Sequence, residues 1–422
     1  MVVPAPTSIP TWSPGCSSRP SATRSLEGAV PVLSTRAASL QQSAIRKLDA
    51  LVRRQVGVRF HRLNIGQPDV PTPAPLLEAI AAFQPEVVAY GPASGLPECR
   101  EAAAAYHARW SPGLRAAHVV ATVGGSEALL FSFTAVCDPG DELLVLEPYY
   151  TNYNGFATVA GAVVRPIRTH LHDGFAIPSD EVLDAAVTER TRAIVFSNPA
   201  NPTGAVYGED ELRRLLRWAT RHDLFVISDE VYRQIWFEEP PTSALSIEEH
   251  ADRVLVIDSL SKTYSACGLR LGFLISRNLD FMEKVERLGQ ARLGPQPLAQ
   301  HVGIAALQLD DSYYASIRRI YRERVTVMMA ALDQLPGVSA PHPRGAFYTM
   351  VELPVDDTER FARFLVEAFR SDGESVVVAP GGGFYAAPES GAQKIRLAAV
   401  TEAPQLQRAV EVLGEALIAY AG

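Results

Sequence analysis

The alternation of strand and helix patterns between residues 118 and 275 constrains the fold of this chain most strongly. Short apolar runs rich in β-branched residues are typical of buried strands, and the segments between them have helical spacing, most clearly at 209–222. A chain that alternates in this way builds a mostly parallel sheet covered by helices on both faces. We therefore predict an α/β fold with strands at 118–122, 142–146, near 163, and at 192–196, 224–228, 254–257 and 273–275.

The pattern changes on both sides of this region. Residues 1–35 are rich in Pro, Ser, Thr and Ala, which predicts a flexible N-terminal arm that lies over a partner subunit. An organelle transit peptide is the alternative, but the many prolines disfavour its amphipathic helix. After residue 311 a long helical stretch is followed by short strand and helix patterns, which indicates a separate α+β domain. The predicted large domain covers 66–311, and the predicted small domain covers 36–65 and 312–422.

Several further elements are expected from the same patterns. A short strand broken by turn residues is expected within 63–69. Helices are expected at 39–56, 98–108, 312–335, 358–371 and 403–420, and the remaining strands at 345–351, 375–378 and 395–398.

The composition limits the classes of partner. A net charge of −8 over 422 residues disfavours nucleic acid or an anionic membrane as the main partner. No stretch approaches the roughly 18 apolar residues of a membrane span. The cysteines lie far apart without a CxxC pair, which indicates reduced thiols in a cytoplasmic protein rather than a disulfide framework or a zinc site. They are Cys16, Cys99, Cys137 and Cys267, and we expect no metal.

Four polar signals stand at the ends of predicted strands, which is where ligands bind in open α/β sheets. Gly124, Gly125 and Ser126 join a strand to a helix, so free N–H groups there favour a phosphate. Asn201 lies in a turn with two Asn-Pro steps, and its amide can point into a cleft. Each of these two signals alone has an ordinary explanation, because glycine turns before helices and Asn-Pro turns are common.

The other two signals are ionisable. Asp229 ends an apolar run, where a carboxylate needs a partner or a proton, and a helix N-cap is the alternative. Lys262 stands in a polar turn at 259–262, where an ammonium beside a buried strand is costly unless it is paired or neutralised. A solvated loop lysine is the alternative. Together, a phosphate cradle, an amide, a carboxylate and a lysine are the groups that hold pyridoxal 5′-phosphate, which binds a lysine as an imine.

At these residues the chain resembles the class I/II aminotransferases, which are fold-type I pyridoxal-phosphate enzymes. The resemblance is carried by motifs that follow the family's order between residues 63 and 398. It implies a large domain with a sheet of the seven-stranded type, a smaller C-terminal domain, and an active homodimer with shared sites. The motifs are LNIGQPD, YGPASGLPECREAAAAY, GGSEAL, EPYYTNY, NPANPTG, DEVY, SLSKTYSACGLRLG, GAFY and IRLA.

The resemblance also implies roles for individual residues. Lys262 would hold the cofactor as a Schiff base and move the proton at the substrate Cα. Asp229 would pair with the pyridine nitrogen of the cofactor, while Tyr232 and Asn201 would hydrogen-bond its phenolate oxygen. Tyr150 would stack on the ring of the cofactor.

Other residues are implied for the phosphate and the substrate. Arg396 would bind the substrate α-carboxylate as a bidentate pair beside Asn201, and Gly66 would let the backbone approach the substrate. Tyr90 would reach the phosphate in the neighbouring subunit. The remaining phosphate ligands would be Gly125, Ser126, Ser259, Ser261 and Arg270.

These residues specify an amino acid and a cofactor, but neither a side chain nor a single reaction. Transamination between an L-amino acid and a 2-oxo acid is the leading prediction. The alternative is a lyase or synthase of specialised metabolism that works by elimination, replacement or cyclisation. A non-catalytic binding role is disfavoured, because the segment before Leu63 is too short and proline-rich for a winged helix. Arg292 is a candidate to receive an acidic side chain, whereas aromatic residues would suit an apolar one, namely Tyr149, Tyr150, Tyr153, Phe384 and Tyr385.

Overall fold

A computed structural model describes residues 32–40 and 44–421 of the chain. The flexible arm predicted for residues 1–35 therefore lies mostly outside the described residues. The first described helix, α1 (Thr35–Ser39), contacts α6 (Asn152–Ala160) of the same chain, where Arg36 Nη1 donates to the Val159 carbonyl at 3.4 Å. Within the described ranges, no helix is long and apolar enough to cross a bilayer.

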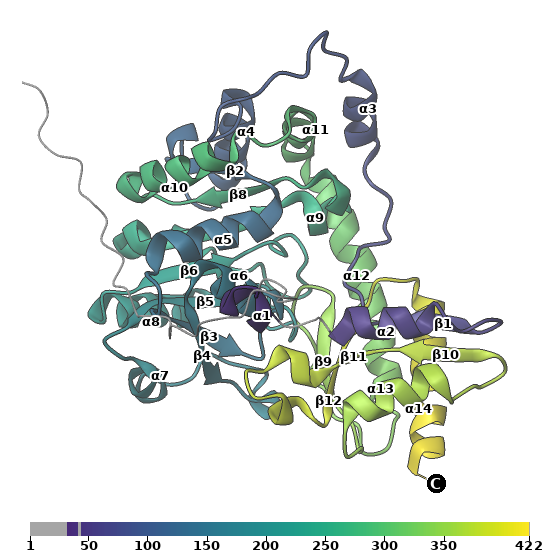
Figure 1. Ribbon diagram of the computed structural model, residues 1–422. Helices are drawn as coiled ribbons and strands as arrows, with labels where there is room; N and C mark the ends of the chain where they lie inside the picture. The colour runs from purple at the N-terminus through teal and green to yellow at the C-terminus, as the bar shows by residue number, and fades with distance from the viewer. Residues whose placement is uncertain (1–31, 41–43, 422) are drawn as a thin grey trace, which may run out of the picture.

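A seven-stranded sheet forms the centre of the larger lobe (Figure 1). Its strands follow the order β2-β8-β7-β6-β5-β3-β4, in which β8 is antiparallel to both of its neighbours and every other pair is parallel. All strands except β8 therefore end at the same edge of the sheet. The strands are β2 (Val119–Thr122), β3 (Glu142–Glu147), β4 (Val163–Arg168), β5 (Thr191–Ser197), β6 (Phe225–Asp229), β7 (Val254–Ser259) and β8 (Gly272–Ile275).

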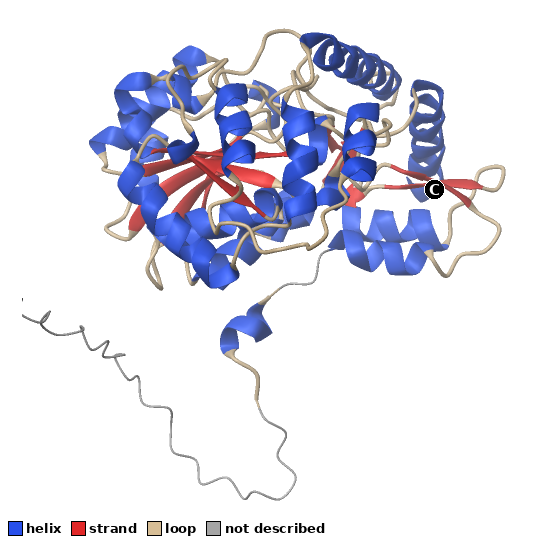
Figure 2. Ribbon diagram, turned by 90° about the horizontal axis from the view of Figure 1, so that it is seen from above, coloured by secondary structure: helices blue, strands red, loops and turns tan. Residues whose placement is uncertain are grey.

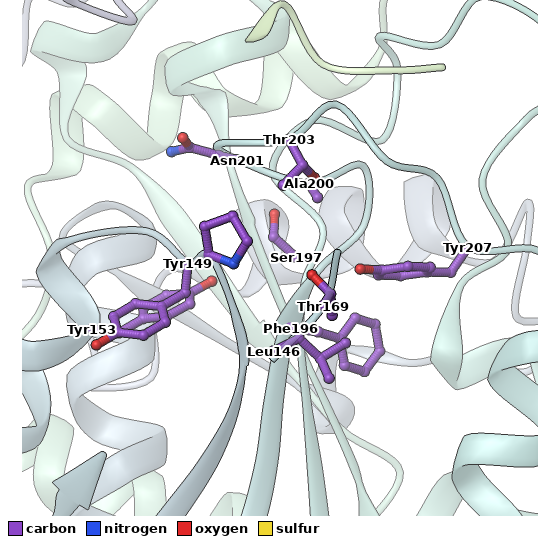
Figure 3. Close-up of a pocket in the computed structure, with 11 residues that line it drawn as sticks. Leu146, Tyr149, Tyr153, Thr169, Phe196, Ser197, Ala200, Asn201, Thr203 and Tyr207 are labelled. Carbon is purple, nitrogen blue, oxygen red and sulfur yellow. The ribbon is translucent and has the colours of Figure 1, made fainter. Parts of the chain in front are cut away.

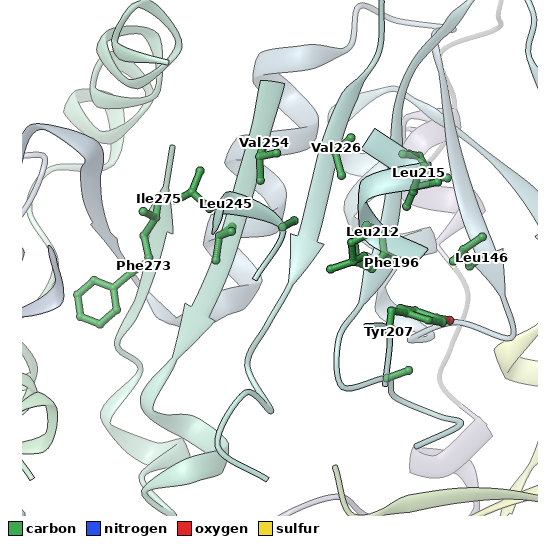
Figure 4. Packing of buried hydrophobic residues seen from close by; sticks show 14 of the residues in the cluster. Leu146, Phe196, Tyr207, Leu212, Leu215, Val226, Leu245, Val254, Phe273 and Ile275 are labelled. Atoms are coloured by element: carbon green, nitrogen blue, oxygen red, sulfur yellow. The ribbon is translucent and has the colours of Figure 1, made fainter. Parts of the chain in front are cut away.

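Helices cover both faces of this sheet, as Figure 2 shows. Because successive side chains of a strand point to opposite faces, Val226 joins one hydrophobic core while Ile227 joins a second core on the other side. Burial on both faces explains why the strands read as continuous apolar runs. Figure 4 shows the first core, where Leu212 and Leu215 of α8 pack beside the sheet. The helices of this lobe also include α3 (Ala74–Ala82), α4 (Pro97–His107), α5 (Gly124–Val136), α7 (Asp180–Ala186), α8 (Glu209–Arg221), α9 (Leu260–Thr263), α10 (Leu279–Arg292) and α11 (Pro297–Leu307).

The second lobe joins the N-terminal and C-terminal parts of the chain. Figure 1 shows the purple α2 (Ala44–Val52) beside the yellow-green C-terminal elements, and Leu48 of α2 belongs to the same core as Phe361 and Leu413. The long helix α12 supplies Tyr314 to the first core and Tyr321 to this one, so it links the two lobes. The exact domain limits stay a prediction. The elements are α2 (Ala44–Val52), α12 (Asp311–Leu332), α13 (Thr358–Glu367) and α14 (Ala403–Ala421), with paired strands β1 (Arg59–Arg62) and β10 (Glu374–Val377) and a sheet of β11 (Ala379–Pro380), β12 (Lys394–Ala398) and β9 (Tyr348–Glu352).

The structure confirms the predicted α/β class and corrects two local predictions. The strand predicted within 63–69 is wrong, because β1 ends at Arg62 and the following Gly- and Pro-containing segment turns toward the cavity described below. The polar turn predicted at 259–262 is largely the one-turn helix α9. The Ser259 side chain caps this helix by accepting a hydrogen bond from the Ser261 N–H at 3.1 Å.

Candidate active site

A cavity of about 720 Å³ opens beyond the carboxyl ends of β5, β6 and β7. Parallel strands bring polar residues that are distant in sequence to this edge, which is where open α/β sheets bind ligands. All the predicted site residues except Tyr90 line the cavity. They are Gly66, Gly125, Ser126, Tyr150, Asn201, Asp229, Tyr232, Ser259, Ser261, Lys262, Arg270 and Arg396.

Lys262 points into this cavity from α9, directly after the buried strand β7. Its Nζ donates to the Gly66 carbonyl at 2.7 Å. Gly66 must be a glycine here, because a Cβ would lie 1.7 Å from the Tyr348 hydroxyl oxygen. The lysine is therefore held beside the loop that follows β1, with its amine available to a ligand in the cavity.

Asp229 is a buried carboxylate at the end of β6. Its Oδ2 accepts a hydrogen bond from the Tyr153 hydroxyl at 2.9 Å, whereas its Oδ1 accepts none of ordinary geometry from the described residues. Burial raises the pKa of Asp229 to about 6, although the Tyr153 hydroxyl, the Val231 N–H and the Lys262 charge all lower it. A cationic N–H donor placed at Oδ1 would stabilise the charged carboxylate.

An anion-binding corner lies between the start of α5 and Arg270. The first turn of a helix leaves N–H groups without intrahelical partners, and α5 begins at Gly124. The guanidinium of Arg270 packs so closely here that a Cβ on Gly124 would lie 2.3 Å from Nη2. Ser261 Oγ lies 3.5 Å from Arg270 Nη1 and 2.9 Å from Ser259 Oγ. Backbone N–H groups, hydroxyls and one fixed cation together suit a phosphate.

Arg396 of β12 brings a cation from the second lobe to the same cavity, although it is only 4% exposed. Its Nη1 donates to Asn201 Oδ1 at 3.1 Å and its Nη2 donates to the Asn64 carbonyl at 2.7 Å, while its Nε has no partner among the described residues. The rings of Tyr348 and Phe384 lie 4.5 and 5.0 Å from its guanidinium carbon. This packing fixes a guanidinium that can bind a carboxylate.

The loop that contains Asn201 and the side chain of Tyr153, which donates to Asp229, lie on two sides of the same packed region, as Figure 3 shows. A second, very small cavity of about 10 Å³ lies between Asn201 and the stacked rings of Tyr149 and Tyr153, whose centroids are 6.4 Å apart. Ser197 at its edge donates from Oγ to the Pro199 carbonyl at 2.9 Å. We interpret this region as structural support behind the larger cavity.

Some predicted residues lie outside the cavity. Tyr90 is 87% exposed at the surface of this chain. Arg292 forms an ion pair with Glu127, with Nε and Oε1 3.2 Å apart, so the suggestion that it receives an acidic side chain is not supported. Of the aromatic residues proposed to suit an apolar substrate, only Tyr150 lines the cavity, whereas the others pack within the protein: Tyr149, Tyr153, Phe384 and Tyr385.

Two tyrosines make contacts in the site that the sequence did not predict, although Tyr153 was among the aromatic residues expected to suit an apolar substrate. Tyr153 donates to Asp229, and the Tyr348 hydroxyl lies 2.9 Å from the Tyr232 hydroxyl. Burial raises the pKa of Tyr232 well above its ordinary value, and the neighbouring Tyr348 raises it further. Both tyrosines lie inside the motifs EPYYTNY and GAFY, so the motifs were the available signal, but the partners in these contacts are distant in sequence.

Comparisons with known proteins agree with this architecture. The family model described as aminotransferase class I and II matches residues 59–413. The probable aspartate/prephenate aminotransferase of Thermus aquaticus is 33% identical over 394 residues, covering 91% of this chain and 99% of that protein.

Two solved structures extend the comparison to the fold. The aspartate aminotransferase of Thermus thermophilus with maleate superposes with a TM-score of 0.84 at 31% identity, over 92% of this chain and 100% of that one. The alanine aminotransferase of Pyrococcus furiosus gives the same values. The match over most of the chain confirms the predicted fold, enzyme class and aminotransferase function. The chain belongs to the class I and II aminotransferase family.

Proposed function

We propose that this protein transfers an amino group between an L-amino acid and a 2-oxo acid with pyridoxal 5′-phosphate bound at Lys262. One observation carries the proposal. A lysine amine (Lys262) and a buried carboxylate (Asp229) face one cavity, which also contains an anion-binding corner, and one oxygen of the carboxylate has no hydrogen bond of ordinary geometry from the described residues.

The residues present fit this cofactor. Asp229 Oδ1 and Arg396 Nε are buried polar atoms that no described residue satisfies, so the site has an acceptor for a ring N–H and a donor for a substrate carboxylate. The corner beside Arg270 offers several donors to a phosphate. When bound, the cofactor supplies an aldehyde that attaches to amines and a ring that withdraws electrons from Cα.

The side chains of this cavity then have separate tasks. Lys262 would hold the cofactor through its aldehyde carbon and, once the substrate amine has replaced it, its free amine would take the proton from Cα and deliver it to the carbon that carried the aldehyde. Asp229 keeps the ring nitrogen protonated, and Tyr153 holds the carboxylate in place. Tyr232 and Asn201 donate hydrogen bonds to the ring oxygen in this proposal.

The remaining residues bind the ends of the ligands. The phosphate takes Arg270 together with the N–H of Gly125 and the hydroxyls of Ser126, Ser259 and Ser261, all of which line the cavity. Tyr150, which lines the cavity, would stack on the ring of the cofactor. Arg396 would bind the α-carboxylate of the substrate, and Gly66 lines the cavity where a side chain would collide with Tyr348.

A half-reaction tests the proposed function. The purified protein loaded with pyridoxal 5′-phosphate should convert one equivalent of amino acid to its 2-oxo acid and hold the amino group until a second 2-oxo acid accepts it. Mass spectrometry of both products with an isotopically labelled amino group measures the transfer. Loss of a leaving group from Cβ or Cγ without amino transfer would instead support the lyase alternative.

Replacing Arg396 with lysine should raise the KM for amino acids by about 10- to 100-fold, because the bidentate contact with the α-carboxylate is lost while a charge remains. Steady-state kinetics measure this change. A primary amine without an α-carboxylate should react equally slowly with both enzymes. The exposed Arg363 of the same lobe, changed to lysine, is the control. An equal fall in kcat/KM for the amine and for the amino acid would contradict the role of Arg396.

We propose that the active form is a homodimer in which Tyr90 completes the site of the partner. Tyr90 stands in an exposed apolar segment with Val87 and Val88, which are 74% and 68% exposed, and Leu77 of α3 is 54% exposed as well. Exposed apolar groups of this kind mark interaction surfaces. A cytoplasmic location is also proposed, because the described cysteines Cys99, Cys137 and Cys267 are free.

Mixed dimers test the shared site. Replacing Tyr90 with alanine should weaken cofactor binding by about 10-fold or more, because a hydrogen bond to a charged phosphate is lost. Coexpression of this variant with Lys262→Ala should then restore activity, since each hybrid dimer regains one native site. Activity assays on purified hybrids, isolated with two different affinity tags, measure the result. Hybrids that stay as impaired as the Tyr90→Ala homodimer would place Tyr90 in the site of its own subunit, and an unimpaired Tyr90→Ala homodimer would show that Tyr90 has no such role.

A further inference from the structure

We infer that the substrate of this site is an amino acid with an uncharged side chain. The side chain lies between the loop that contains Ile65 and Gln67 and the start of α6. This inference rests on the proposed function, because Lys262 and Arg396 fix where the α-amino and α-carboxylate groups bind.

The charged groups of the cavity are all engaged in the proposed function. Among the described residues that line it, the charged side chains are those of Lys262, Arg270, Arg396 and Asp229. The first two hold the cofactor and the third holds the α-carboxylate, while Asp229 faces the ring nitrogen. A second carboxylate or a second ammonium on the substrate would therefore enter the cavity without an opposite charge, and burying an unpaired charge is costly.

Neutral residues line the part of the cavity that remains. Ile65 and Gln67 come from the loop after β1, and Thr151 and Asn152 come from the start of α6. The Thr151 methyl lies 3.7 Å from where a Cβ on Gly383 would stand, so the two lobes approach each other beside this region. Amides, a hydroxyl and an aliphatic side chain suit an uncharged substrate, whether polar or apolar.

Arg292, the cation considered for an acidic side chain, contacts other groups of the protein. Arg292 pairs with Glu127, its Nη2 donates to the Ala121 carbonyl at 3.2 Å, and its guanidinium carbon lies 5.7 Å from the centre of the Phe131 ring. Glu127 also accepts a hydrogen bond from the Val123 N–H at 2.8 Å, so the pair is anchored to the backbone. The segment that the proposed dimer would bring to the site, 87–91, reads VVAYG and adds no charge.

Pairs of amino acids with the same shape but different charge test this inference on the holoenzyme. We expect kcat/KM for glutamine to exceed that for glutamate by about 100-fold or more, and asparagine to exceed aspartate similarly. The kcat/KM for citrulline should likewise exceed that for arginine, because no carboxylate among the described lining residues is available to pair with a guanidinium. An acidic or basic member that reacts better than its neutral counterpart would overturn the inference. If no amino acid reacted, the proposed function itself would be wrong.

Binding provides a second readout that does not depend on turnover. Calorimetric titration of the holoenzyme with maleate and with its monoamide should show tighter binding of the monoamide, since both retain one carboxylate for Arg396. Asn152→Arg should reduce the preference for asparagine over aspartate by about 10-fold or more, because it supplies the missing cation. The neutral variant Asn152→Gln should retain that preference. An unchanged preference in Asn152→Arg would place the side chain away from α6 and overturn the inference.

Discussion

Replacing Lys262 with alanine should lower the transamination rate by at least about 10⁴-fold, because both the covalent attachment of the cofactor and the proton transfer at Cα depend on one amine. Among the described residues that line the cavity, Lys262 is the one lysine, and its Nζ lies 2.7 Å from the Gly66 carbonyl. Single-turnover kinetics measure the loss. Addition of a small primary amine should restore part of the rate, because the truncated side chain leaves space beside the cofactor.

A covalent readout separates attachment from folding. Borohydride reduction of the loaded wild-type enzyme should fix the cofactor on the peptide that contains Lys262, as seen by mass spectrometry, and the alanine variant should show no such mass. Lys284→Ala is the matched control, because Lys284 is exposed on α10 and pairs with Asp280 at 3.0 Å. A cofactor trapped on another lysine in the wild type would contradict the assignment of Lys262.

The part of the site that the sequence predicted consists of residues at strand ends. Asp229 ends β6, and Asn201 and Lys262 lie in the short segments after β5 and β7, so parallel neighbours bring these residues together at one edge of the sheet. Local patterns were sufficient for these residues. Each one stands near the carboxyl end of a predicted strand, and the parallel sheet places these strand ends beside one cavity. Arg396 required the family resemblance, since nothing in its own strand indicates that β12 faces the large lobe.

Contacts between distant segments could not be predicted in the same way. The bond from Tyr153 to Asp229 joins residues 76 positions apart, and the contact between Tyr232 and Tyr348 joins residues 116 positions apart. The suggestion for Arg292 lacks support for the same reason. Arg292 was suggested as a partner for an acidic side chain because of its charge alone. Its partner Glu127 becomes visible only in the packing of α10 against α5.

These tertiary contacts also determine how the charges of the site behave. The sequence showed only that Asp229 ends an apolar strand. The structure adds the depth of burial and an oxygen without a partner of ordinary geometry, and burial is what raises the pKa of Asp229 to about 6. A residue that is unfavourable for the stability of the free protein is therefore the one that the proposed cofactor needs most.

Replacing Asp229 with asparagine should reduce activity by about 10²- to 10³-fold while making the cofactor-free protein more stable at neutral pH. Asparagine cannot keep the ring nitrogen charged, so the electron-withdrawing state of the cofactor is lost. It can still accept the hydrogen bond of the Tyr153 hydroxyl, so the packing around β6 is retained. The two effects have opposite signs, which a general folding defect would not produce.

The sign of the stability effect follows from the pKa. Burial raises the pKa of Asp229 from 3.8 to about 6, so the folded cofactor-free protein binds this proton more tightly than the unfolded chain does. Its unfolding free energy therefore falls as the pH rises between about 4 and 6, by about 3 kcal/mol in total. The asparagine variant has no proton to lose at this position, so it should lack this decrease and exceed the wild type by about the same amount at pH 7.

Urea unfolding of both cofactor-free proteins at several pH values measures the difference. Asp280→Asn, on the surface of α10, is the control and should follow the wild-type curve closely. Adding the cofactor should make the wild type more stable to unfolding than the asparagine variant at neutral pH, because only the wild-type carboxylate gains an ion pair with the ring nitrogen. A variant that remained less stable than the wild type without cofactor would mean that the Asp229 carboxylate is already satisfied within the protein, and the proposed pairing with the ring nitrogen would lose its main support.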